Sequence, residues 1–254
     1  MIQGGLKMFI RTITLFGLIF LTYANSAEAT STPIQDSVVI DTYMIDITGD
    51  GSKETIQLEG KMLSSNSTYF PFVVANIQSQ TGESWSIELP GGFEPSLQFT
   101  DLTNNDTNEL LYKGSVSPTK HSYTYKVHTF ENEEFTSIPI PEDSFVHGKF
   151  QENFIAHIYI TPHEDPIIVD LKDKANDYIH SGVYHKNGTL LKQQDIMIEP
   201  IHSITPIDTE ESSTIIETLQ RVSSMIDSSE LGLIESRWTY ENHSWKLIDS
   251  SWKQ

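Results

Sequence analysis

The chain has 254 residues, a formal net charge of −19 and no cysteine. The absence of cysteine excludes disulfides, thiolate metal sites and a cysteine nucleophile, so a core of apolar side chains must stabilise the fold. The acidic balance favours cations near the surface and disfavours anionic polymers and membranes. We therefore expect no nucleic-acid partner.

Residues 1–29 have the pattern of a secretory signal peptide. Arg11 precedes the uncharged apolar run TITLFGLIFLTYA, and Ala27-Glu28-Ala29 has the small-x-small pattern that signal peptidase cleaves. The run is shorter than the roughly 20 residues of a membrane-spanning helix, so cleavage after Ala29 is favoured over a membrane anchor. We expect a secreted, extracellular protein, free or loosely associated with the cell wall, with no membrane contact after cleavage.

Met8 is our hypothesis for the true start of the protein. Gln3-Gly4-Gly5 can be encoded by a purine-rich stretch that resembles a bacterial ribosome-binding site, a few codons ahead of Met8. Residues 1–7 would then come from an over-extended gene prediction.

After a Ser/Thr-rich linker at residues 30–37, residues 38–254 form a single predicted domain. It consists of short apolar or alternating runs, such as FPFVVANIQ, SYTYKVHTF and IAHIYI, separated by turn residues. β-Branched and aromatic residues dominate these runs, which is typical of an all-β domain. The apolar spacing of residues 213–226 also suits a helix, but we favour a strand there because of the repeat described next.

A spacing near 54 residues recurs along the domain. Acidic loops begin at Asp46 and Asp101, 55 residues apart (101 − 46), and a weaker copy begins at Asp208, 107 residues further on (208 − 101). The larger interval is close to twice the smaller one and leaves room for an unmarked unit. Each unit also closes with a strand, a polar turn and a second strand. We therefore predict four β-repeat units of about 54 residues, at residues 38–94, 95–143, 144–197 and 198–254.

The first loop has the pattern of a calcium site. Its odd positions carry oxygen-bearing side chains that a tight coil directs inward: Asp46, Thr48, Asp50, Ser52 and Glu54. Calcium prefers six to eight oxygen ligands, and the seventh position of such a loop commonly contributes its main-chain carbonyl. Gly51 suits the sharp turn because glycine adopts positive φ without steric cost. We predict a Ca²⁺ site here; the alternative is an Asp-Gly hairpin turn with solvated acids.

The second loop repeats this pattern in a weaker form, with Asp101, Thr103, Asn105, Thr107 and Glu109. Asp106 stands where the first loop has glycine, and aspartate adopts a left-handed conformation only at some cost. The second loop is therefore predicted either to bind calcium more weakly or to be a purely structural turn. The third loop has Ile216 at the closing position, so it is not expected to bind metal.

The D-x-T-G-D-G-x-x-E loop at Asp46–Glu54 resembles the FG-GAP/VCBS-type repeats of secreted and cell-surface proteins. The final hairpin, with Trp238-Thr239-Tyr240 and Trp245-Lys246-Leu247, is similar to the ending of small VCBS-like exoproteins of Gram-positive bacteria. The resemblance implies the blades of a small propeller-like arrangement, with calcium bound in a loop between strands. A β-sandwich is the alternative arrangement. The resemblance implies no catalytic activity.

No enzyme motif such as G-x-S-x-G, a P-loop or H-E-x-x-H occurs in the sequence. The acidic segment Glu131–Glu134 is predicted to be a hairpin tip, and the four tryptophans are predicted to pack rather than to form a carbohydrate platform. We expect a secreted, non-enzymatic β-repeat protein that serves as a binding or cell-envelope-associated module for a protein or cell-wall partner. The alternative is an extracellular hydrolase whose catalytic carboxylates come from different repeats. The oligomeric state stays open.

Overall fold

The computed structural model describes residues 37–253, apart from 65, 120–121, 142–145, 162–164, 210–213 and 225–228. The expected signal peptide, the start at Met8 and all but the last residue of the linker lie outside the described residues. The described residues belong to one compact unit.

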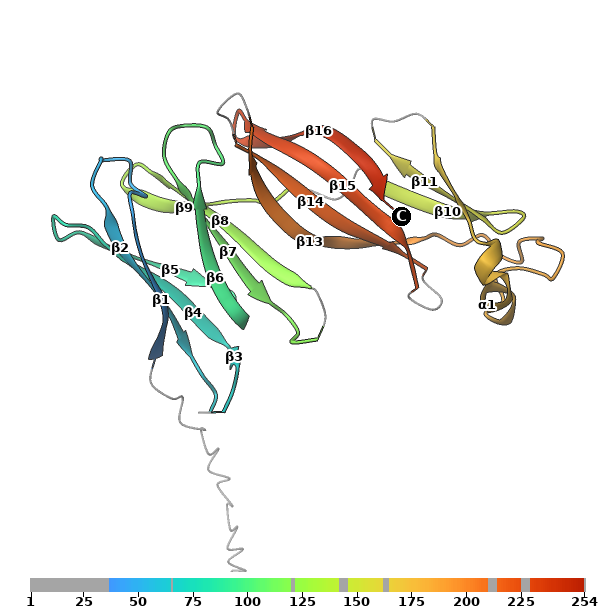
Figure 1. The fold of residues 1–254 in the computed structure, drawn as a ribbon, viewed down its shortest axis with the longest axis horizontal. Helices are drawn as coiled ribbons and strands as arrows, with labels where there is room; N and C mark the ends of the chain where they lie inside the picture. The colour runs from blue at the N-terminus through green and yellow to red at the C-terminus, as the bar shows by residue number, and fades with distance from the viewer. Residues whose placement is uncertain are drawn as a thin grey trace, which may run out of the picture. The chain divides into compact units, whose positions relative to one another are not determined.

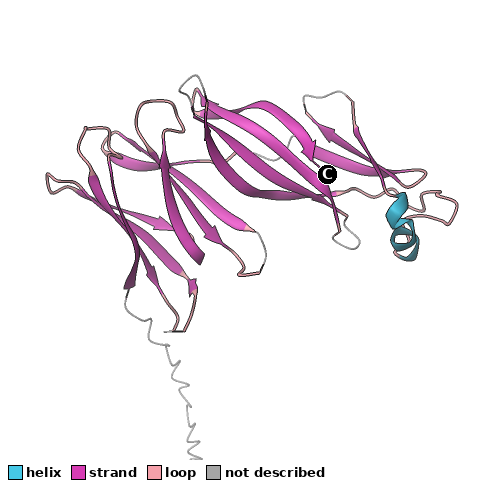
Figure 2. Ribbon diagram, in the orientation of Figure 1, coloured by secondary structure: helices cyan, strands magenta, loops and turns pink. Residues whose placement is uncertain are grey.

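Among the described residues, the strands form four antiparallel sheets that follow one another along the chain, except that β3 joins the second sheet from between two strands of the first (Figures 1 and 2). The first sheet, in the order β1-β2-β4-β5, contains β1 (Ser37–Ile45), β2 (Glu54–Lys61), β4 (Phe72–Gln78) and β5 (Ser84–Leu89). The second, in the order β3-β6-β7-β8-β9, contains β3 (Tyr69–Phe70), β6 (Gly92–Thr100), β7 (Glu109–Ser115), β8 (Tyr123–Glu131) and β9 (Glu134–Ile138).

The third sheet contains β10 (Val146–Gln151), β11 (Ile155–Ile160) and β12 (Ile167–Asp170), followed by a 3-10 turn (Lys172–Lys174) and α1 (Ala175–His180). The fourth contains β13 (Met197–Asp208), β14 (Thr214–Ser223), β15 (Glu230–Glu241) and β16 (Ser244–Lys253). The predicted all-β class is confirmed, and separate antiparallel sheets fit either a sandwich-like or a propeller-like arrangement. Within the described ranges, no helix has the length and apolar character that a membrane span requires.

Alternating side chains set the inner and outer faces of the sheets. In β2, Ile56 and Leu58 are buried while Gln57 between them is exposed, as the two-residue period of a half-buried strand requires. In β14 the same period buries Ile216 and Val222. The predicted strand at residues 213–226 is therefore confirmed over Thr214–Ser223, where pairing with both β13 and β15 overrides the helix-like apolar spacing.

In the described part of the chain, three apolar clusters join the four sheets. One lies between the first and second sheets, one between the second and fourth, and one between the third and fourth. The central strand β7 contributes Leu110 and Tyr112 to the first of these clusters and Leu111 to the next. Because both of its faces are buried, β7 has a continuous apolar run rather than an alternating one.

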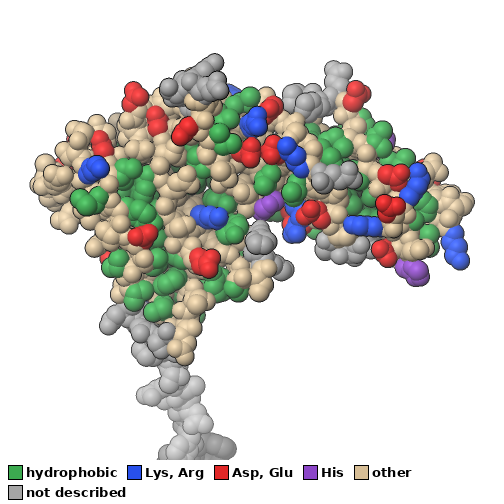
Figure 3. Space-filling view, in the orientation of Figure 1, with side chains coloured by type: hydrophobic (Ala, Val, Ile, Leu, Met, Phe, Trp, Pro, Cys, Tyr) green, Lys and Arg blue, Asp and Glu red, His purple; other side chains and the backbone are tan. Residues whose placement is uncertain are grey.

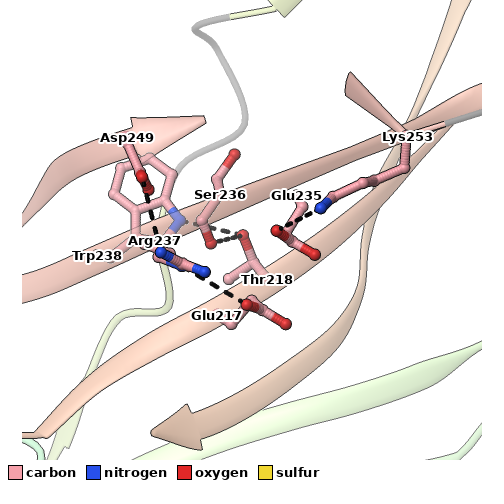
Figure 4. A network of polar contacts seen from close by, with 8 residues as sticks. All are labelled: Glu217, Thr218, Glu235, Ser236, Arg237, Trp238, Asp249 and Lys253. Atoms are coloured by element: carbon pink, nitrogen blue, oxygen red, sulfur yellow. Dashed lines mark hydrogen bonds and ion pairs between the residues drawn. The ribbon is translucent and has the colours of Figure 1, made fainter. Parts of the chain in front are cut away.

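β15 separates a buried tryptophan from a row of charged side chains (Figure 4). Trp238 is 6% exposed, and its indole Nε1 donates to Thr218 Oγ1 at 3.0 Å. On the outer face, the Arg237 guanidinium lies 3.7 Å from Glu217 and 3.8 Å from Asp249, and Lys253 lies 3.1 Å from Glu235. On the face drawn in Figure 3, most Lys and Arg side chains lie over the C-terminal sheets.

Candidate functional site

The first acidic loop is a tight coil between β1 and β2, organised by its own carboxylates. Asp46 accepts hydrogen bonds from the amides of Gly49 (2.7 Å) and Gly51 (2.9 Å), one at each carboxylate oxygen. Asp50 accepts from the amide of Ser52 at 2.6 Å. Gly49 and Gly51 have φ values of 75° and 86°, a conformation that glycine adopts without strain. The predicted odd-position residues therefore share one compact loop.

The second loop has a similar conformation with different side chains, and one of its hydrogen bonds to the leading aspartate is shifted by one residue. Asp101 accepts from the amides of Asn105 and Asp106, both at 2.9 Å, and Asn105 accepts from the amide of Thr107 at 2.9 Å. Asn104 and Asp106 have φ values of 56° and 65° at the positions that Gly49 and Gly51 occupy in the first loop. Asn and Asp are the non-glycine residues that tolerate this region best, so the loss of glycine leaves the loop conformation intact.

The glutamate that closes each loop is fully buried. Glu54 Oε2 accepts from the amides of Ile47 (3.0 Å) and Thr48 (3.3 Å). Glu109 Oε2 accepts from the amides of Leu102 (2.6 Å) and Thr103 (3.0 Å) at the equivalent positions. One oxygen of each carboxylate thus ties the entrance of its loop to the following strand.

The other carboxylate oxygen distinguishes the two loops. Glu109 Oε1 accepts from the hydroxyls of Thr103 (3.0 Å) and Thr129 (2.9 Å). Burial raises the pKa of Glu109, and these donors, with the two amides, act in the opposite direction. In the first loop, Glu54 Oε1 and Thr48 Oγ1 are both buried and make no hydrogen bond within the described part of the chain. An unsatisfied buried polar group costs about 1–3 kcal/mol. The two atoms without hydrogen bonds therefore destabilise the first loop, whereas the equivalent carboxylate oxygen of the second loop has two donors.

Strand pairing explains why Glu54 has no threonine donor. Continuing the pairing of Leu110 with His128 by one residue places Thr129 opposite Glu109. In the first sheet, continuing the pairing of Thr55 with Gln78 by one residue places Ser79 opposite Glu54. The Ser79 hydroxyl instead lies 2.8 Å from Thr81 Oγ1 and accepts from the Glu83 amide at 3.0 Å. The Ser79 hydroxyl is therefore used in hydrogen bonds within the turn between β4 and β5 and does not reach Glu54.

The three loops found by spacing lie next to one another. The Asn108 side-chain amide donates to the Asp46 carbonyl at 3.3 Å, and a Cβ at Gly49 would lie 2.7 Å from Thr107 Oγ1. On the other side, Asn104 Oδ1 accepts from the Thr214 amide at 2.8 Å, at the end of the third loop. The second loop therefore lies between the first and the third. Residues 210–213 of the third loop are outside the described residues.

Carboxylates alone do not form a metal centre in these loops. Among the residues that the structure describes, no three His, Cys, Asp or Glu side chains gather closely enough to hold a metal ion. In the first loop, Glu54 points into the protein, where its Oε2 accepts hydrogen bonds from two main-chain amides. This carboxylate therefore does not gather with the other two. Any cation there would also need hydroxyl and carbonyl oxygens, which calcium accepts readily.

A second polar site lies between the edge strands β5 and β9. A hollow of about 440 Å³ is lined by Glu88 of the first sheet and by His128, Glu134 and Ser137 of the second. His128 Nδ1 is buried without a hydrogen-bond partner among the described residues. Sequence spacing could not identify this hollow, because its residues come from two sheets and from distant parts of the chain.

His128 makes stability depend on pH. Burial, with a smaller contribution from Lys126, lowers the pKa of its imidazole, so the unfolded chain takes up a proton near pH 6.5 while the folded protein does not. Stability should therefore fall as the pH drops through about 6.5, until the folded imidazole also protonates. Unfolding free energies at about pH 7.5 and 5.5 should differ less in His128→Gln than in the wild type. The exposed His185→Gln should behave like the wild type, and an equal loss in all three proteins would contradict this role.

The remaining sequence-predicted features are the Glu131–Glu134 segment and the four tryptophans. The Glu131–Glu134 tip is a tight turn between β8 and β9, with Asn132 and Glu133 at φ 52° and 67°. Trp85, Trp238 and Trp252 belong to three different apolar clusters, and Trp245 packs beside the cluster of Trp238. The tryptophans therefore form no common platform.

Comparison with known proteins gives one partial match. Residues 144–253 are similar to the YybI C-terminal domain family, a span that contains the third and fourth sheets. No curated protein and no solved structure matches the chain. The first two acidic loops lie outside the matched span.

Proposed function

We propose that the protein is a secreted, non-enzymatic β-repeat protein that binds calcium in its first loop and serves as a binding or cell-envelope-associated module. The support for secretion is the sequence of residues 1–29. The support for calcium is the pair of buried oxygens, Thr48 Oγ1 and Glu54 Oε1, that have no hydrogen-bond partner among the described residues. The partner of the module would be a protein or a cell-wall component.

The donor types of the first loop fit a calcium ion, and binding would require Asp46, Asp50 and Glu54 to draw closer together than they lie in this structure. Asp46, Asp50 and Glu54 would supply carboxylate oxygens, Thr48 its hydroxyl and Ser52 its carbonyl, which are the hard oxygen ligands that calcium prefers. A bound cation supplies positive charge that offsets the repulsion among these carboxylates and satisfies the two buried oxygens. In the second loop, the hydroxyls of Thr103 and Thr129 already donate to the equivalent carboxylate oxygen. We therefore propose that the second loop is structural.

Thermal unfolding tests this proposal. At free calcium about 100 times Kd, one site adds about 2.7 kcal/mol, which is a rise in Tm of about 5–11 °C for a protein of this size. Asp50→Asn should lose this rise, because it gives the first loop the amide that Asn105 provides in the second. Asp106→Asn removes one exposed charge from the second loop and should keep the rise. A Tm that is equal in chelator and in calcium would contradict the proposal.

A hydrolase is the second candidate, and one observation favours it. The hollow between β5 and β9 has a carboxylate from each of the first two units, Glu88 and Glu134, beside His128, and such a pair can serve as general acid and base. Turnover of polysaccharide, peptidoglycan or ester substrates that survives calcium removal and is lost in Glu88→Gln and Glu134→Gln would favour this candidate. Without such turnover, the non-enzymatic proposal stands.

A further inference from the structure

β5 is an edge strand without the features that usually close an edge to other chains. Among the described strands it pairs only with β4, in a regular register from Ser84 to Leu89, and it contains neither proline nor lysine. Register shifts interrupt the pairing of β1, β13 and β16, and β13 also contains Pro200 and Pro206. Natural sheets use bulges, prolines and lysines to keep a further strand from pairing, so β5 is an open edge.

The turn before β5 shows which main-chain groups of this strand point outward. The Ser79 amide donates to the Glu83 carbonyl at 2.9 Å, so these two residues form a hydrogen-bonded pair of the ladder. Such pairs alternate with non-hydrogen-bonded pairs in antiparallel strands, and the outward amides and carbonyls of β5 therefore belong to Ser84, Ser86 and Glu88. All three residues are exposed. No hydrogen bond among the described residues uses these outward groups.

This open edge borders the hollow of about 440 Å³ between β5 and β9. Ser86 and Glu88 line the hollow from the edge of β5. Strand alternation places Trp85 and Ile87 on the opposite, inner face of β5, and they line the hollow together with Phe135 of β9. The hollow therefore offers main-chain donors and acceptors beside an apolar wall.

The charged side chains of the hollow are acidic. Glu88 and Glu134 line it from opposite sheets, and neither forms an ion pair or a side-chain hydrogen bond with another described residue. Lys and Arg do not contribute to the lining, and His128 is its remaining titratable residue. In a protein with a net charge of −19, these carboxylates favour a ligand that carries positive charge.

We infer that an extended, basic segment of a polypeptide adds to β5 as a fifth strand of the first sheet. A row of outward amides and carbonyls at strand spacing selects another extended main chain, which pairs with it as a neighbouring strand does. A glycan has no such repeating amide and carbonyl groups. The inference rests on the proposed role as a binding module and names the chemistry of its protein partner.

The alternation of β5 also specifies the side chains of the added strand. Successive side chains of a strand lie on opposite faces, so those opposite Ser86 and Glu88 share the face of the Glu88 carboxylate. The side chains between them lie beside Ile87 on the apolar wall. The preferred segment therefore alternates Lys or Arg with apolar residues.

Fluorescence anisotropy of a labelled heptapeptide that alternates lysine with valine tests this inference. The peptide is titrated with the secreted chain, beginning after Ala29, in chelator and at low ionic strength, and it should bind the wild type. A peptide with glutamate in place of each lysine should bind at least tenfold more weakly. Methylation of the lysine main-chain amides should weaken binding as much, because residues opposite Ser86 and Glu88 would direct their amides toward β5.

Ser86→Pro should weaken binding of the lysine–valine peptide at least tenfold, because proline removes an outward amide. Edge strands tolerate proline where the amide faces solvent, so the fold should remain, and circular dichroism checks this. Asn76→Ala is the matched control. It removes the hydrogen bond that the Ser86 hydroxyl donates to Asn76 Oδ1 at 3.1 Å and leaves the main chain of β5 unchanged, so it should bind like the wild type.

Absence of binding to the wild type, equal binding of the glutamate or methylated peptide, or unchanged binding in Ser86→Pro would each overturn the inference. A wild-type dimer in size-exclusion chromatography that Ser86→Pro converts to a monomer would also overturn it, because a second copy of the chain would then occupy the edge. Failure to bind peptide leaves the calcium response of Tm unaffected, and loss of that response leaves peptide binding in chelator unaffected. The two proposals can therefore fail separately.

Discussion

Replacing Glu109 with alanine should destabilise the protein by about 3 kcal/mol, because three donors lose their acceptor together. The Thr103 amide and the hydroxyls of Thr103 and Thr129 all donate to this carboxylate. The Leu102 amide also donates to it but keeps a second acceptor, the Thr100 carbonyl at 3.0 Å. Each donor that stays buried without a partner costs about 1–3 kcal/mol, so the loop should loosen from β7.

Chemical denaturation measures this effect directly. Glu134→Ala is the control, because this glutamate is exposed in β9 and surface substitutions usually change stability by no more than about 0.5 kcal/mol. If Glu109→Ala unfolded with the same midpoint as Glu134→Ala, the buried carboxylate would not organise the second loop.

Replacing Trp238 with alanine should be at least as damaging, at about 3–5 kcal/mol. This indole fills the cluster that joins the second and fourth sheets, and its loss leaves a cavity and removes the hydrogen bond that Nε1 donates to the Thr218 hydroxyl. For a protein of this size the Tm should fall by about 6–20 °C.

Arg237→Ala is the matched control for Trp238, one residue away in β15. Its guanidinium pairs with Glu217 and Asp249 at 3.7 and 3.8 Å on the solvent side, and exposed ion pairs contribute about 0–1 kcal/mol. The two variants should therefore differ severalfold in their effect on the unfolding free energy. Similar effects would mean that Trp238 does not join the sheets.

The acidic loops could be located from the sequence because their geometry is local. Asp46 and Asp101 bond to amides within five residues of themselves, so the spacing of Asp and Gly is enough to predict the coil. The all-β class was predictable for the same reason, since the two-residue alternation of β2 or β11 is a property of a few neighbouring residues.

The features that distinguish the loops depend on distant residues and could not be predicted. Thr129, which satisfies Glu109, is 20 residues away, and the contact between Asn104 and Thr214 spans 110 residues. Whether Ser79 bonds to Glu54 or to its own turn is decided by the geometry between β4 and β5. α1 was also missed, because a helix of six residues has little intrinsic stability and depends on burial of Tyr178 in the cluster between the third and fourth sheets.

Calorimetric titration of the metal-free protein with calcium tests the central claim most directly. The wild type should bind calcium at one site, with a Kd in the range of about 0.1–1 mM that is typical of extracellular modules. Asp50→Asn should weaken this binding at least tenfold, and Asp106→Asn should leave it unchanged. Absence of binding to the wild type, or equal binding to both variants, would contradict a calcium site at Asp46–Glu54.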